Sequence, residues 1–90
     1  MTIEQLLEKL ENDMAKADRV RHDCYEKCCE LNAEIKDIFD YSCGTDDFSR
    51  QLDELRIRLR TAECEERMAC CELFLISIAI DKIKEGLGQV

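Results

Sequence analysis

The feature that most constrains this chain is a heptad pattern of apolar and small side chains, which covers most of the sequence and is interrupted once. The pattern advances in alternating steps of four and three residues, and its first run is Ile3, Leu7, Leu10, Met14, Ala17, Arg21, Cys24, Cys28, Leu31, Ile35 and Ile38. A second run with this spacing is Phe48, Leu52, Leu55, Leu59, Ala62, Glu66, Ala69, Leu73, Ile76, Ile80, Ile83 and Leu87. Such a period is typical of α-helices that pack as coiled coils, and strands are not expected. The chain has no Pro and three Gly, which agrees with long helices.

The ends of the two runs carry signals for where helices begin and end. Thr2 and Gln5 have the spacing of a capping box, in which both side chains satisfy free backbone N–H groups. Residues 42–47 contain the only glycine before residue 86, together with several residues that favour turns. We therefore expect one helix over about 3–41, a turn at 42–46 and a second helix over about 46–86.

The turn decides how the two helices lie relative to each other. We expect Thr45 to cap the second helix, and Gly86 and Gly88 to end it. A short connection between two helices of similar length makes them antiparallel neighbours. The whole chain, residues 1–90, is thus predicted to be a single all-α domain, an antiparallel two-helix coiled-coil hairpin.

Each run contains one charged residue, Arg21 in the first and Glu66 in the second. Folding the chain at Cys43 and Gly44 pairs residues whose numbers add up to about 87, so these two charges should lie opposite each other. A buried ion pair is a weak source of stability, but it can select one register because any slip leaves both charges unpaired. The alternative is that both side chains extend to solvent along their apolar stems.

The second helix carries a further apolar stripe on its opposite side. Its members share the four-and-three spacing and carry no charge: Ile57, Thr61, Cys64, Met68, Cys71, Leu75 and Ile78. The first helix can cover only one of the two faces, and monomers rarely expose an apolar strip of this length. Reversing the stripe about Met68 superposes it on itself, as a two-fold interface requires. We therefore expect two hairpins to pair into a four-helix bundle; the alternatives are a different protein partner or another register.

Net charge and hydropathy indicate which classes of partner to expect and in which compartment the protein is located. The formal net charge of -8 repels nucleic-acid backbones and anionic lipid surfaces, so no direct nucleic-acid binding is expected. The most apolar window, residues 68–80, is shorter than the roughly 20 residues of a membrane-spanning helix. The first residues lack the basic and apolar segments of a signal or transit peptide, which predicts a cytoplasmic protein.

Seven cysteines are many for ninety residues, but their number is odd and no export signal accompanies them. We therefore expect reduced thiols that pack as small apolar side chains. Two pairs are alternative metal ligands: Cys24 with Cys28, one helical turn apart, and Cys64 with Cys71, which would meet across a two-fold interface. The remaining cysteines fall outside both stripes and are expected at the surface: Cys29, Cys43 and Cys70.

The sequence contains no pattern that predicts an enzyme or a resident cofactor. The only histidine, His22, falls on the outer side of the first helix, and two helices lying side by side offer no obvious concave pocket for a base and a nucleophile. We therefore expect a non-enzymatic, homodimeric interaction module, that is, an adaptor, scaffold or inhibitor of a protein partner that remains unidentified. The first alternative is a Cu- or Zn-binding bundle that uses the cysteines.

A second alternative uses the acidic side of the first helix. Eight carboxylates share this side and could imitate a nucleic-acid backbone toward a basic protein: Glu4, Glu8, Glu11, Asp18, Glu26, Glu30, Asp37 and Asp40. Most such faces are only solvated surface, and neighbouring Lys and Arg dilute the negative field. The acidic mimic is therefore the third hypothesis, after the interaction module and the metal-binding bundle.

Overall fold

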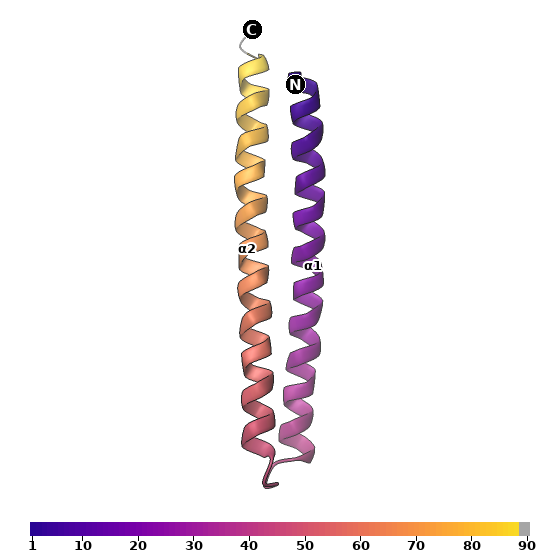
Figure 1. Cartoon of the computed structure of the whole chain (residues 1–90), viewed down its shortest axis with the longest axis vertical. Coiled ribbons are helices and arrows are strands. Elements are labelled where there is room, and N and C mark those ends of the chain that lie inside the picture. The colour runs from indigo at the N-terminus through magenta and orange to yellow at the C-terminus, as the bar shows by residue number, and fades with distance from the viewer. Residues whose placement is uncertain (89–90) are drawn as a thin grey trace.

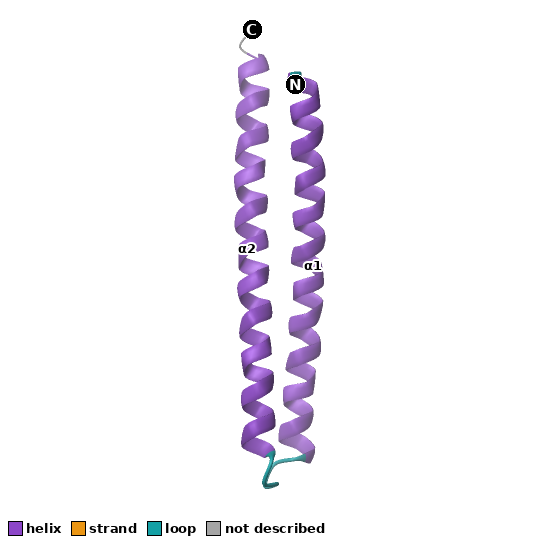
Figure 2. Ribbon diagram, in the orientation of Figure 1, coloured by secondary structure: helices purple, strands orange, loops and turns teal. Residues whose placement is uncertain are grey.

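The computed structural model describes residues 1–88, which form two long helices joined by a short loop (Figure 1). Helix α1 spans Ile3–Tyr41 and helix α2 spans Phe48–Gly88. The helices run antiparallel along a rod of 69 × 17 × 15 Å, and the described part of the chain contains no strand (Figure 2). The predicted all-α hairpin is confirmed. Within residues 1–88, no helix has a segment that is both long enough and apolar enough to cross a membrane.

Helix α1 begins and ends where the sequence pattern predicts. The Gln5 backbone N–H donates to Thr2 Oγ1 at 3.1 Å, and the Thr2 backbone N–H donates to Gln5 Oε1 at 2.9 Å. These two hydrogen bonds are the predicted capping box, which satisfies donors that have no partner within the helix. At the other end, the Ser42 backbone N–H donates to the Ile38 carbonyl at 2.9 Å and closes the last turn.

The connection between the helices differs in detail from the prediction. The Thr45 hydroxyl does not cap α2 but donates to the Ser42 carbonyl at 2.7 Å, which tightens the loop. Helix α2 therefore begins at Phe48, two residues later than predicted, and the carbonyl of the preceding Asp47 accepts from the Gln51 N–H at 3.0 Å. Gly44 has a φ of +93°, a left-handed conformation that explains why a glycine stands in this loop.

The far end of α2 also extends beyond the prediction. Gly86 was expected to end the helix, but α2 continues through it to Gly88, the last described residue. A Cβ at position 86 would meet no atom within 4 Å, so this glycine is not required by close packing. Its weak helix propensity, about 1 kcal/mol below alanine, is not sufficient to stop a helix of 41 residues.

The two heptad runs form the inner faces of the hairpin. Nine side chains from these runs are buried: Ala17, Cys24, Cys28, Leu31, Leu52, Leu55, Ala62, Ala69 and Ile80. Next to the loop, Phe39 and Phe48 pack edge to face with their ring centroids 5.3 Å apart. Ala62 has an exposed fraction of 1%, the lowest among these residues. The buried side chains in the middle of the rod are therefore small, whereas leucine and phenylalanine side chains pack near its loop end.

Candidate functional site

The outer side of α2 carries a stripe of exposed apolar side chains, which we call the outer stripe: Ile57, Thr61, Cys64, Met68, Cys71, Leu75 and Ile78. Three of its large residues are well over half exposed, Met68 at 71%, Ile57 at 67% and Leu75 at 65%. Two residues of helix turn through about 200°, which places these positions opposite the buried seam of α2. The hairpin therefore buries one apolar face of α2 and exposes the other.

Thr61 is the one polar side chain in the outer stripe, and its hydrogen-bonding capacity is met within its own helix. Its hydroxyl donates to the Ile57 carbonyl at 3.0 Å. A threonine that bonds back to the preceding turn presents mainly its methyl group to the outside. The outer stripe can therefore be buried without leaving the Thr61 hydroxyl without a partner.

The apolar surface is wider than the stripe that the sequence predicts. Val20 of α1 lines a shallow groove with Met68, Cys71 and Leu75, and this groove has a volume of about 680 Å³. On the other side of α2, a second groove includes the ring of Phe74, which is 66% exposed. Neither Val20 nor Phe74 was predicted from the sequence to border this surface. Their positions immediately beside the heptad seams were the available signal, because residues that flank a coiled-coil seam border the adjacent groove.

Charged residues also line the first groove. Glu65 and Glu72, one heptad apart, line it together with Arg67. An apolar centre with charged edges is the usual arrangement of a protein interaction surface.

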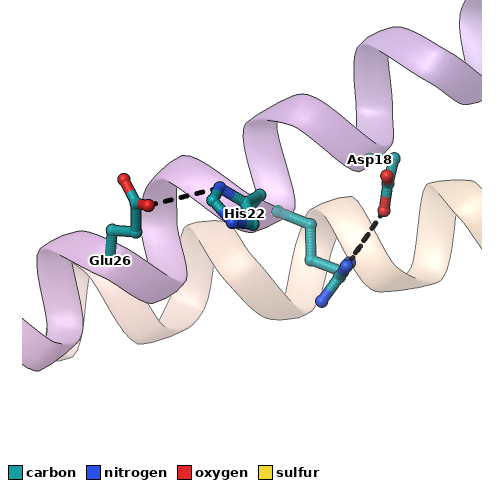
Figure 3. A network of polar contacts seen from close by, with 4 residues as sticks. Asp18, His22 and Glu26 are labelled. Atoms are coloured by element: carbon teal, nitrogen blue, oxygen red, sulfur yellow. Dashed lines mark hydrogen bonds and ion pairs between the residues drawn. The ribbon is translucent and has the colours of Figure 1, made fainter.

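The charged inner position Arg21 is held by a residue of its own helix. Its Nε and Nη2 atoms donate to Asp18 Oδ1 at 3.2 and 3.0 Å (Figure 3). Hydrogen bonding to Asp18 is the main cause that raises the pKa of Arg21. The charge of Glu66 on α2 raises this pKa by a smaller amount. The Arg21 side chain is 38% exposed, so part of it stays in water. The register pair of Arg21 with Glu66 therefore remains a prediction, with Asp18 as a competing partner that sequence reasoning did not consider.

The seven cysteines are free thiols, of which two are buried and five are exposed. Cys24 and Cys28 are buried between the helices, with exposed fractions of 7% each. The others are exposed on the single hairpin, as expected for the three outside both stripes: Cys29, Cys43, Cys64, Cys70 and Cys71. Cys64 and Cys71 belong to the outer stripe, so their burial depends on what covers it.

The buried thiols lie in a negative environment. The Cys24 thiol donates to Glu65 Oε2 of α2 across a distance of 3.8 Å. Burial raises the pKa of Cys24, and Glu65 raises it further. Burial likewise raises the pKa of Cys28, with additional contributions from Glu66 and Glu63. Both groups are therefore thiols and not thiolates at neutral pH, which disfavours a reactive nucleophile here.

The outer side of α1 carries many exposed charged side chains. His22 Nδ1 lies 3.7 Å from Glu26 Oε1 one turn further along (Figure 3), and the ligand atoms of His22, Asp23 and Glu26 lie within 4.8 Å of one another. All three side chains are exposed, so the prediction of a surface position for His22 is confirmed. The acidic residues assigned to this helix are also all exposed: Glu4, Glu8, Glu11, Asp18, Glu26, Glu30, Asp37 and Asp40.

Comparison with known proteins adds no further constraint on the site. No protein-family model matches the chain, and neither a curated protein nor a solved structure was found to be similar to it.

Proposed function

We propose that the chain is a non-enzymatic interaction module that works as a homodimer. Two hairpins pair through the outer stripe into a four-helix bundle, with the α2 helices inside and the α1 helices outside. The acidic outer surface of α1 is then presented to a protein partner in the cytoplasm. The observation that carries this proposal is the exposure of the outer stripe, where Met68 is 71% and Leu75 is 65% exposed.

The large exposed surface area of a single hairpin supports its pairing with a second copy. The chain exposes 7055 Å², whereas a compact monomer of its mass, 10.5 kDa, exposes about 5,400 Å². The excess is about 1,600 Å², the difference of the two values. A standard interface buries about 800 Å² on each partner. Pairing with a second copy would thus remove a substantial part of the excess that the rod shape creates.

The order of side chains in the outer stripe favours a second copy as the occupant. With a two-fold axis near Met68, Ile57 of one copy lies near Ile78 of the other, and Thr61 lies near Leu75. Cys64 of one copy then lies near Cys71 of the other. Every position meets an uncharged side chain, and the same patch serves on both subunits, as an isologous interface requires.

Sedimentation equilibrium of the reduced protein tests this assembly. The wild type should sediment as a dimer, and Met68→Glu should be a monomer because it places two carboxylates at the axis, without water to solvate them. Ala33→Glu adds the same charge on the exposed outer side of α1 and should leave the dimer intact. A wild type that stays monomeric at high concentration, or a Met68→Glu variant that stays dimeric, would refute the proposed interface.

Cysteine cross-linking tests the orientation of the two copies. Mild oxidation with diamide should link Cys64 of one copy to Cys71 of the other, and peptide mapping should find this mixed pair. A parallel arrangement would instead link Cys64 to Cys64 and Cys71 to Cys71. The Cys64→Ser variant should not form the disulfide between residues 64 and 71 on oxidation. The Cys43→Ser variant, which is changed in the loop, should still form it.

A further inference from the structure

The groove that includes the Phe74 ring, which we call the second groove, is separate from the surface that the proposed dimer uses. It has a volume of about 600 Å³, and its apolar lining comes from Met14 and Ala15 of α1 and from Leu73 and Phe74 of α2. The Phe74 ring is 66% exposed, although an aromatic ring contributes strongly to packing once it is covered. Phe74 lies about 100° of helix turn from Leu75, so it faces a different direction from the outer stripe.

The α1 side of the second groove is acidic, because Glu11 and Asp18 both line it. Lys9 and Lys16 each precede one of these acids by two residues, which is about 200° of helix turn, so both lysines lie on the opposite side of α1. Asp18 accepts a hydrogen bond from Arg21 Nη2 at 3.0 Å, which offsets part of its charge. Glu11 forms no ion pair among residues 1–88, so its carboxylate can pair with a cation from outside the chain.

The negative charge is concentrated toward the end of the rod that holds the termini. On α1, Glu4 precedes Glu11 by one heptad, and both side chains are exposed. On α2, Asp81 follows Phe74 by one heptad in the same direction, whereas Arg67 precedes Phe74 by one heptad toward the loop. Residues one heptad apart share a helix face, so the exposed ring has carboxylates on its terminal side.

We propose that the second groove binds an amphipathic helix of another protein, with apolar side chains against Phe74 and lysines or arginines beside Glu11. Two antiparallel helices form a straight groove into which a third helix can lay its apolar face. A large aromatic ring at the centre of such a contact is a common anchor of binding. This inference rests on the proposed function as an interaction module and names the partner, but it does not require the outer stripes to pair.

Surface area and charge both favour this occupant. A single hairpin exposes about 1,600 Å² more than a compact chain of its mass, and a standard interface through the outer stripe buries about 800 Å² of it. Enough area therefore remains for a second interface. A second copy of this chain fits the groove less well, because its formal net charge of -8 opposes the carboxylates there.

Fluorescence anisotropy with synthetic peptides tests the proposal. The probe is a labelled helical peptide of three heptads, with Leu at the seam positions and Lys beside them. It should bind the full chain, whereas a peptide of the same composition in scrambled order should bind at least tenfold more weakly. A peptide with Glu in place of Lys should not bind. Equal binding of the ordered and the scrambled peptide would mean attraction by net charge alone and would overturn the proposal.

Matched variants locate the peptide on the chain. Phe74→Ser should weaken binding at least tenfold, whereas Tyr41→Ser, which removes an exposed ring at the loop end, should leave it unchanged. Glu11→Gln should weaken binding severalfold and reduce its salt dependence, because an exposed ion pair is screened by salt. Glu34→Gln removes an exposed carboxylate elsewhere on α1 and should have no effect. Circular dichroism checks that each variant is helical. Wild-type affinity in a helical Phe74→Ser variant would overturn the assignment.

Two further variants separate this site from the dimer interface. Met68→Glu, which should be a monomer, should still bind the Lys peptide, so loss of pairing and loss of peptide binding are distinguished. Binding that Val20→Ser abolishes and Phe74→Ser leaves intact would move the peptide to the first groove and overturn the proposal. Self-association of Met68→Glu that is lost when Phe74→Ser is added would assign the second groove to another copy of the chain, which would equally overturn it.

Discussion

The two helices of the hairpin have similar inner faces but very different outer faces. Leu31 of α1 and Leu55 of α2 belong to the same buried cluster, with exposed fractions of 6% and 7%. On the outside, the middle of α1 presents exposed charged groups, namely Arg19, Asp23, Glu26 and Glu30. The matching part of α2 presents exposed uncharged groups, namely Cys64, Met68, Cys71 and Leu75. Formation of the hairpin covers one apolar face of each helix, and it leaves the second apolar face of α2 exposed.

The largest expected effect tests whether the inner faces are truly equivalent. Leu31→Ala and Leu55→Ala should each lower the free energy of unfolding by about 2–4 kcal/mol, because each removes a buried side chain and leaves a cavity. Urea unfolding at one fixed protein concentration measures both. A loss below about 1 kcal/mol in only one variant would show that the two helices contribute unequally to the core.

A substitution in the outer stripe should have a smaller effect, and this effect should appear in the dimer dissociation constant. Leu75→Ala should raise the dimer dissociation constant at least tenfold, since each dimer loses two apolar side chains worth roughly 1 kcal/mol or more apiece. Lys16→Ala, on the outer side of α1, should leave the constant unchanged. Sedimentation across a concentration series measures both variants. Equal constants for Leu75→Ala and the wild type would mean that the outer stripe is not the interface.

Salt should act in opposite directions on the two outer faces. Sodium sulfate should strengthen pairing of the outer stripes because it favours burial of apolar surface. Binding of a polylysine peptide to α1 should instead weaken severalfold as salt rises, because exposed charges are screened. A Glu26→Gln, Glu30→Gln variant should bind the peptide less tightly and dimerise normally. Dimers that dissociate in sulfate would point to an electrostatic interface.

The smallest effect concerns the register of the inner faces. Glu66→Arg would place a second guanidinium opposite Arg21, so the hairpin should become less stable. Arg21→Glu in the same chain should restore part of the loss if these two positions face each other, as the sequence predicts. Thermal unfolding of the two single variants and the double variant measures this coupling. An additive result would mean that Arg21 interacts chiefly with Asp18.

Much of the fold could be predicted from the sequence because its determinants are local. The capping box joins Thr2 and Gln5, which are three residues apart, so it can be predicted from the sequence. The heptad seams repeat every two helical turns, so the buried face of each helix also follows from the pattern. The loop was less predictable. The Thr45 hydroxyl can either cap a helix or donate to a carbonyl of the turn. The sequence does not show which of these two partners lies within hydrogen-bonding distance.

The outer stripe was predictable for the same reason, since every member stands on one helix with a fixed spacing. The groove beside it was not predictable, because Val20 comes from the other helix and lines the same groove as Met68 only after the hairpin has formed. The choice of Asp18 as the partner of Arg21 also depends on side-chain conformation, which a heptad pattern does not specify.

The sequence by itself determined the two helices, their antiparallel packing and the two apolar faces of α2. These properties depend on residues within a few positions of one another and on the helix period. Only the tertiary structure decided that Glu65 lies against Cys24, that Val20 borders the outer stripe and that Arg21 bonds to Asp18. These contacts depend on register and rotamer, and a shift of one helix by a single turn, about 5.4 Å, would replace the contacts between the helices without altering the heptad pattern.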